Sequence, residues 1–318
     1  MGMEDGKHLV VPVEMEGEPS GIAALQSVVK LTTQPYLVIA VPCGDKELKT
    51  QLTCPENLGG CGQEYMIDGY RYPHLVPLHW HIAMTNMKRP LNIATLMMWE
   101  AGKRSTDARQ RMTREAIKLN AKYILYVDDD TLPEQESLYT LMHFMESHPE
   151  AGAVSGVYVS REHPPVPHVY KEHGKGHYWD LEIGPYAEPE QVFGVGAGFL
   201  LARVSAIKDT IEKLKYDNDG KEVPMWADET FIPNVTEDGT KRTIDLGHDI
   251  RFCWLLNSSG WPVYADGRVL CKHFDFEHGL MFELPDDYPG RKRYRDRMEA
   301  EFGTPKLSDL DDESFLED

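Results

Sequence analysis

Apolar segments of strand length alternate with segments of helical periodicity along most of this chain. Continuous apolar runs predict three buried strands: PYLVIAV (35–41), YILYV (123–127) and AGAVSGVYV (151–159). Helical spacing marks LHWHIAMTNM (78–87), and Asp107 with Gln110 predicts a capped helix start that leads through Leu119. Strands that alternate with helices are typical of an α/β fold with a largely parallel sheet.

The second half of the chain continues this pattern with more glycine. VFGVGAGFLLAR (192–203) predicts a glycine-punctuated strand, IRFCWLLNSSG (250–260) a short helix, and PVYADGRVLCKHF (262–274) two short strands. Pro133 is expected at the start of a further helix. The apolar stripe of that helix would consist of Leu138, Leu141, Met142 and Met145.

Three parts are expected from these patterns. Residues 1–33 are expected to form a weakly structured leader, and residues 34–280 are expected to form the α/β domain with a cysteine-containing insertion at 48–73. Residues 281–318 combine a basic segment with an acidic tail. The basic run RKRYRDR (291–297) predicts a solvated helix face, with a groove for an anionic acceptor as the alternative.

Composition narrows the class of protein. The 318 residues are 41% hydrophobic, which allows a sizeable core, and the net charge of −19 disfavours non-specific binding to nucleic acid or anionic membranes. Five cysteines are an odd number, which argues against a secreted disulfide framework. No apolar stretch is long enough to span a bilayer, and the acidic N-terminus lacks a signal-peptide pattern. A cytoplasmic protein is therefore expected.

Three consecutive acids, Asp128, Asp129 and Asp130, follow the predicted strand 123–127. Like charges this close repel and raise each other's pKa. In open α/β sheets ligands bind beyond the carboxyl ends of the strands, and carboxylates there suit Mg²⁺ or Mn²⁺ that carries phosphates. A bound dication would remove the repulsion. The alternative, that these acids only cap the helix after Pro133, would need one aspartate rather than three.

An ordered set of segments over residues 35–275 resembles glycosyltransferases with the GT-A fold, close to the family-2 type. YILYVDDDTLP resembles their DxD region and PYLVIAVPCGD their first strand, while VFGVGAGFLLARVSAI resembles the glycine-rich strand below the sugar. STDARQRMTREAIKLN resembles the helix before the DxD strand, with Gln110 in place of the usual Asn. LGHDIRFCWLLNSSGWPVYADGRVLCKH resembles the Glu-Asp motif with its helix and closing His, although His248 stands where Glu is usual.

The resemblance implies roles for particular residues. Asp128, Asp130 and His273 correspond to metal-site residues for Mn²⁺ or Mg²⁺. Residues near the nucleotide-diphosphate sugar, with a UDP-sugar favoured, would be Pro42, Arg109, Asp128, Asp129, Gly196 and Gly198. For Arg109 an exposed helix charge is nearly as good an interpretation. The glycines do not fit a dinucleotide fingerprint, because FLLAR continues as a strand.

Asp249 is the candidate catalytic base. Transfer of a sugar to a hydroxyl group needs a carboxylate that takes the proton of the acceptor, and the metal stabilises the departing diphosphate. The expected reaction is a single displacement with inversion at the sugar carbon. A structural alternative is that Asp249 serves as the first-turn acid of the helix that follows. Trp226 could stack on a sugar or base, or lie in the core.

Other functions stay open at the level of sequence. A nucleotidyltransferase of sugar phosphates would share the sheet and carboxylates, but VPCGDKEL is a poor match to its glycine- and lysine-rich loop. A catalytically silent nucleotide-sugar-binding module would need no base. The acceptor could be a glycan, a small molecule or the hydroxymethylated base of modified viral DNA. Cys54 and Cys61 are either half of a structural zinc site or two free thiols.

Overall fold

A mixed sheet organises the part of the chain that the computed structural model describes. The described residues are 35–44, 66–67, 70–71, 78–221, 223–228, 230–235, 241–275 and 278–302. All of them belong to one unit, residues 34–318. The predicted leader, most of the cysteine-containing insertion with Cys54 and Cys61, and the acidic tail lie outside the described residues, so the zinc hypothesis stays a prediction.

Nine of the described strands form this sheet. Along its main path the order is β15 (Leu280–Phe282), β14 (Val263–Asp275), β7 (Ala153–Val157), β11 (Phe199–Arg203), β5 (Tyr123–Val127), β1 (Leu37–Gly44) and β4 (Thr95–Lys103). The pairs β1–β4, β1–β5 and β7–β14 are parallel, whereas β11 is antiparallel to both of its neighbours. Two short strands, β6 (Thr131–Pro133) and β9 (Glu190–Val192), pair with β14.

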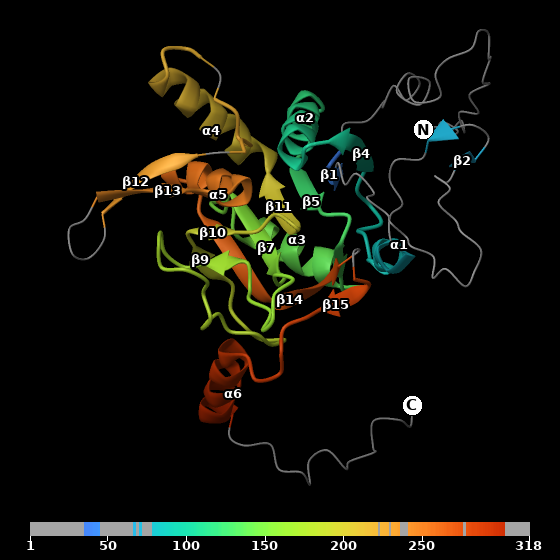
Figure 1. Ribbon diagram of the computed structural model, residues 1–318, viewed down its shortest axis with the longest axis vertical. Helices are drawn as coiled ribbons and strands as arrows, with labels where there is room; N and C mark the ends of the chain where they lie inside the picture. The colour runs from blue at the N-terminus through green and yellow to red at the C-terminus, as the bar shows by residue number, and fades with distance from the viewer. Residues whose placement is uncertain are drawn as a thin grey trace, which may run out of the picture. The chain divides into compact units, whose positions relative to one another are not determined.

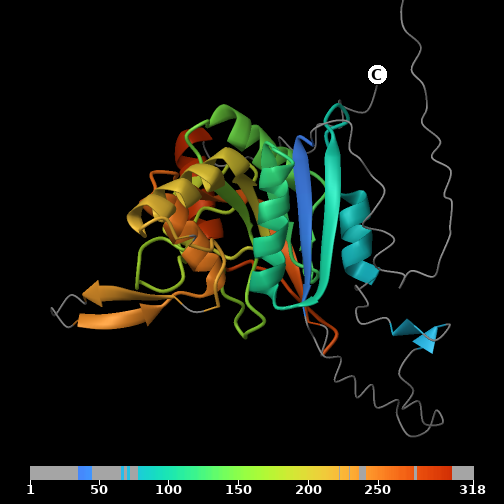
Figure 2. The same cartoon turned by 90° about the horizontal axis from the view of Figure 1, so that it is seen from above.

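Helices cover both faces of the sheet (Figures 1 and 2). One face packs against α2 (Ser105–Lys118), α4 (Val204–Asp217) and α5 (His248–Ser258), and the other against α1 (Leu78–Asn86) and α3 (Ser137–Ser147). Successive residues of β5 supply the two cores in turn, because side chains alternate across a strand. Ile124 and Tyr126 join the first core, and Leu125 joins the second. The prediction of an α/β fold with a mostly parallel sheet flanked by helices is confirmed.

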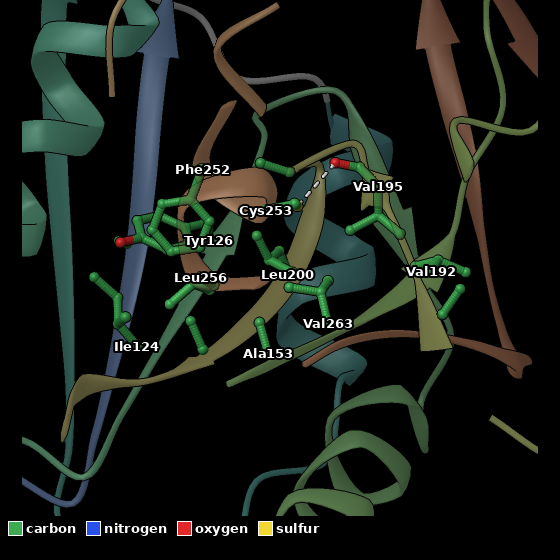
Figure 3. Close-up of a cluster of buried hydrophobic side chains, with 14 of the residues drawn as sticks. Ile124, Tyr126, Ala153, Val192, Val195, Leu200, Phe252, Cys253, Leu256 and Val263 are labelled. Carbon is green, nitrogen blue, oxygen red and sulfur yellow. Dashed lines mark hydrogen bonds between the residues drawn. The ribbon is translucent and has the colours of Figure 1, made fainter. Parts of the chain in front are cut away.

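The core on the α5 side lies between that helix and the sheet. Figure 3 shows Tyr126 and Phe252 beside Leu200 and Val263, and the Cys253 thiol donates to the carbonyl oxygen of Val195 at 3.6 Å. Burial raises the pKa of Cys253 to about 12, so this thiol is an inert core group. This packing fixes α5, and therefore its first turn, against the sheet.

Four sequence-based boundaries were wrong. Pro133 ends β6, and the next helix begins at Ser137, although its predicted apolar stripe is buried. Helix α2 begins at Ser105 with no side-chain cap, so Asp107 lies inside its first turn, and the Gln110 side chain accepts a hydrogen bond from the main chain of Trp226. The segment 192–203 is divided among β9, β10 (Gly194–Val195) and β11, and β14 is one strand rather than two. Strand β4 was not predicted.

Shorter elements complete the fold. Hairpin pairs join β2 (Met66–Ile67) to β3 (Tyr70–Arg71) and β12 (Phe231–Val235) to β13 (Lys241–Asp245), while β8 (Val169–Tyr170) pairs with β10. In the described part of the chain, no helix combines the length and the apolar character needed to cross a membrane.

The basic run forms α6 (Pro289–Phe302), and its arginines contact acids of the same chain. Arg297 Nε lies 2.8 Å from Glu182 Oε2, and Arg293 Nη1 lies 3.3 Å from Glu190 Oε1. A Cβ on Gly184 would come within 2.5 Å of the Tyr294 ring, so the helix packs closely on this segment. Two of the basic side chains therefore anchor α6.

Candidate active site

The three aspartates lie at the carboxyl end of β5, in a turn that leads to β6. The main-chain N–H of Asp128 donates to the carbonyl of Gly198 at 3.0 Å, and Trp80 Nε1 donates to the carbonyl of Asp128 at 2.7 Å. Asp128 and Asp129 are half-buried, and Asp130 is buried. Because α3 begins only at Ser137, these acids do not cap it, and the helix-capping alternative is wrong.

Arg109 is a buried cation that joins Asp128 to Asp249. Its Nη2 lies 2.5 Å from Asp128 Oδ1 and its Nη1 lies 2.9 Å from Asp249 Oδ1, while the arginine itself is only 1% exposed. Burial disfavours its charge, but the two carboxylates hold the pKa of Arg109 above its ordinary value. The interpretation of Arg109 as an exposed helix charge is therefore wrong.

Asp249 opens α5 and is bound from three sides. Its Oδ1 accepts from Arg109 and contacts His248 Nδ1, and its Oδ2 accepts from the main-chain N–H of Ala197 at 3.0 Å. Burial would raise the pKa of Asp249, but Arg109, His248 and the Ala197 N–H together hold it well below its usual range. At neutral pH this carboxylate is ionised.

The pKa of Asp128 is shifted in the opposite direction, above its ordinary value. Burial is the largest cause of its raised pKa, and the nearby charges of Asp130 and Asp249 add to that effect against the pull of Arg109. Two neighbouring carboxylates with diverging pKa values are a common arrangement where acids have different roles in one site.

His248 was noted in the sequence only as a departure from the expected Glu. Its Nδ1 contacts Asp249, and its Nε2 lies 3.3 Å from Ser105 Oγ. The residue thus supports the orientation of Asp249 without adding a further carboxylate next to it.

A second charged group joins Asp130, His273 and Arg161. Residues Thr131 and His273 face each other in the β6–β14 pairing, which brings His273 Nε2 to 3.5 Å from Asp130 Oδ1. The Arg161 guanidinium donates to Asp130 Oδ2 and to His273 Nε2, the latter at 3.1 Å. Nothing in the sequence pattern pointed to Arg161, which lies in a proline-rich loop.

Asp130 and His273 have the chemistry of a partial metal site. His273 Nδ1 lies 2.7 Å from the carbonyl of Val159, which can only accept, so Nδ1 carries the proton and Nε2 offers its lone pair. A carboxylate and an imidazole fit Mn²⁺ or Mg²⁺ that takes its remaining ligands from phosphate and water. No cluster of three such ligands forms among the described residues, and Asp128 pairs with Arg109 instead.

A cavity of about 560 Å³ opens beside Asp249. Its wall includes Gly196 and His248 on the side of the carboxylate, with His168, Tyr170 and Phe193 contributing imidazole and aromatic surface. The loop from β7 and the first turn of α5 therefore enclose a space that reaches the ionised carboxylate.

The predicted glycines and Pro42 lie close to these groups. A Cβ on Gly196 would lie 2.0 Å from Tyr158 Oη, and one on Gly198 would lie 2.7 Å from Thr131 Oγ1, so packing alone already requires both glycines. Pro42 lies in β1 opposite Glu100 of β4. Burial first, and then the charges of Asp129 and Asp128, raise the pKa of the adjacent Cys43 to about 12, which places the end of β1 beside the aspartates.

Trp226 belongs to the core. It is 3% exposed, stacks on Phe252 with ring centroids 4.4 Å apart, and lies 5.1 Å from the guanidinium carbon of Arg109. Its Nε1 donates to Thr113 Oγ1 at 3.1 Å. These contacts support Arg109 from below and leave no open ring face for a sugar.

Comparison with known proteins gives limited likeness. No family model matches the chain, and no curated protein matches it. The crystal structure of A197 from STIV matches with 12% identity and a TM-score of 0.42, over 79% of this chain and 94% of A197. S. aureus TarS 1-349 in complex with UDP-GlcNAc matches with 11% identity and a TM-score of 0.32, over 73% of this chain and 56% of that chain. At this level neither structure fixes the activity.

Proposed function

We propose that this chain is an inverting, metal-dependent glycosyltransferase that moves a sugar from a nucleotide-diphosphate sugar to a hydroxyl group. The observation that carries the proposal is the ionised Asp249, fixed by Arg109 at the wall of a cavity and beside the acidic end of β5. Ionised carboxylates with strongly shifted pKa values in the wall of a cavity are common in catalytic sites, and this supports catalysis over binding alone.

Asp249 can accept a proton without moving. Its Oδ1 is occupied by Arg109 and His248, whereas its Oδ2 accepts a hydrogen bond from the Ala197 N–H and has a further lone pair. An acceptor hydroxyl in the cavity would donate to this oxygen and lose its proton as its own oxygen attacks the sugar carbon. Because Arg109 keeps Asp249 a weak base, the proton transfers while the new bond forms rather than before it.

The diphosphate side of the reaction falls to Asp130 and His273. A dication held by these two residues would supply charge stabilisation for the leaving diphosphate. Asp128 pairs with Arg109, which offsets its negative charge toward that diphosphate. One displacement opposite the leaving group inverts the configuration at the sugar carbon.

The acceptor is proposed to be a glycan or a small polyol rather than DNA. The cavity wall carries the carboxylates of Asp249, Asp228 and Glu172, which repel a polyanion. Arg293 and Arg297, which offered the alternative of an anionic groove, contact Glu190 and Glu182 instead.

A matched pair of variants tests the role of Asp249. Asp249→Asn keeps the size of the side chain but cannot serve as the base, so transfer should fall about 10²–10⁴-fold while donor binding stays near normal. Asp107→Asn is the control, because Asp107 is also a first-turn acid, in α2, and is exposed. Donor binding is read first by thermal stabilisation with UDP, GDP, TDP and CMP sugars, with and without Mn²⁺.

The product decides the mechanism. The anomeric configuration of the product, followed by NMR, should be opposite to that of the donor. Retained configuration, or near-normal turnover by Asp249→Asn, would reject Asp249 as the base of an inverting displacement.

A further inference from the structure

Arg109 and Arg161 both contact the aspartates that follow β5, and their side chains differ in solvent exposure. Arg109 has a side chain only 2% exposed and is fixed between Asp128 and Asp249. Arg161 has a side chain 33% exposed, while its partners Asp130 and His273 are buried. Of the three groups in the second cluster, Arg161 is therefore the one that can leave.

The loop that carries Arg161 explains this difference. Residues 160–166 extend beyond a bridge between Val159 and Pro167, and the main-chain N–H of Ser160 donates to the carbonyl of Val166 at 2.8 Å. Residues 161–164 at the tip are exposed. The base of the loop is thus tied to the body of the domain, while the arginine reaches back from the solvent side.

Arg161 occupies the ligand atoms that a dication would use. It donates to Asp130 Oδ2 and to the lone pair of His273 Nε2, the two donors that fit Mn²⁺ or Mg²⁺. A guanidinium and a dication cannot share these atoms. A guanidinium is also a good partner for a diphosphate, because its planar fork matches phosphate oxygens.

We propose that Arg161 is an exchangeable cation: it holds Asp130 and His273 before the donor arrives and transfers to the donor's diphosphate when a dication takes the pair. This inference rests on the proposed function and adds to it the order in which Arg161 and the dication occupy Asp130 and His273. Without nucleotide, Arg161 competes with the dication. With nucleotide, Arg161 has a new partner, so the competition disappears and the two ligands favour each other's binding.

Direct binding of Mn²⁺, followed by the EPR signal of the free ion, tests the exchange without measuring activity. Wild type and Arg161→Ala are titrated with MnCl₂, alone and with saturating UDP, with a correction for the Mn²⁺ that UDP binds by itself. Arg295→Ala is the control, because it removes the same charge from the exposed face of α6. Arg161→Gln, which keeps most of the side-chain length, serves as a second variant should Arg161→Ala fold poorly.

The expected result is a difference in Mn²⁺ affinity between Arg161→Ala and wild type that disappears or reverses when UDP is present. Without UDP, Arg161→Ala should bind Mn²⁺ at least about tenfold more tightly than wild type, because a competitor that fills the site nine-tenths of the time weakens apparent affinity tenfold. With UDP, the variant should lose this advantage or bind more weakly than wild type. Arg295→Ala should follow the wild type in both titrations.

Two outcomes would overturn the exchange. Equal Mn²⁺ affinity of wild type and Arg161→Ala without UDP would show that Arg161 does not compete, and an equal gain with and without UDP would show that it only repels the ion. The proposed function is judged separately by sugar transfer. If the wild type transfers no sugar but UDP still removes or reverses the difference in Mn²⁺ affinity, the proposed transfer is rejected and the proposed exchange stands.

Discussion

Replacement of Arg109 by Met should be among the most destabilising single changes in this domain. At an effective dielectric constant of about 20, a charge pair at 4 Å is worth about 4 kcal/mol, and Arg109 makes two closer contacts, with Asp128 and Asp249. Part of this attraction offsets the desolvation of the three groups. Removal of one partner from a buried ion pair costs about 3–5 kcal/mol, and that is the loss expected in urea unfolding at pH 7.5.

The loss should depend on pH with a definite sign. Without Arg109, the two carboxylates are buried near each other, and their pKa values in the folded protein rise above the unfolded value of about 3.9. A raised folded-state pKa favours the folded state at low pH, and this advantage disappears as pH rises through that pKa. The deficit of Arg109→Met should therefore be smaller at pH 5 than at pH 7.5.

Arg111→Met provides the comparison within the same helix. Arg111 has a side chain 52% exposed and pairs with Glu100 at 3.0 Å, so its loss should change stability by no more than about 1 kcal/mol. The reasoning is refuted if Arg109→Met costs no more than Arg111→Met, or if its deficit is the same at both pH values. Adding Asp249→Asn to Arg109→Met should restore part of the stability, since one of the two opposed charges is then gone.

Three further outcomes are expected. Gly196→Ala should lose about 1–3 kcal/mol in urea unfolding, because its Cβ would lie 2.0 Å from Tyr158 Oη, and Tyr158→Phe should partly restore it. Burial lowers the pKa of His168 to about 4, so between pH 6.5 and 4 the unfolded chain binds a proton that the folded chain does not, which costs at most about 3 kcal/mol of stability. His168→Phe should therefore lose less stability than the wild type over this pH range. Arg297→Ala should lower the melting temperature more than Arg295→Ala, because Arg297 is the one of these two arginines that contacts Glu182; equal shifts would contradict the anchoring of α6.

Elements with strong local signals were predictable from the sequence. The run 123–127 is apolar at every position, as a strand buried on both faces must be, and the acids that follow could only lie at its carboxyl end. Strand β4 was missed because its residues are mostly half-buried at the edge of the described sheet and show no clear period. The segment 262–274 was expected to hold two strands but lies in the single strand β14, where Gly267 allows a close approach: a Cβ there would lie 1.7 Å from the carbonyl oxygen of Glu182.

The site was predictable in its residue types but not in its pairings. Asp130 and His273 were expected to share a metal, and strand pairing does bring them together. Asp128 was expected with them, yet Arg109 draws it toward Asp249, a partner 121 residues further along the chain than Asp128 (249 − 128). Sequence patterns report neighbours along one element, whereas these contacts depend on how three elements meet. The contact of Arg161 with Asp130 is of the same kind.

The position of β11 has a consequence for how this protein reaches its native state. Strand β11 pairs with β5 on one side and β7 on the other, but it follows both in the chain, at residues 199–203. As the chain leaves the ribosome, β5 and β7 are complete some 40 to 70 residues before the strand that joins them (199 − 157 and 199 − 127). Unpaired strand edges invite association between chains. Refolding yield should therefore fall as protein concentration rises, and chains that end before residue 199 should aggregate rather than fold.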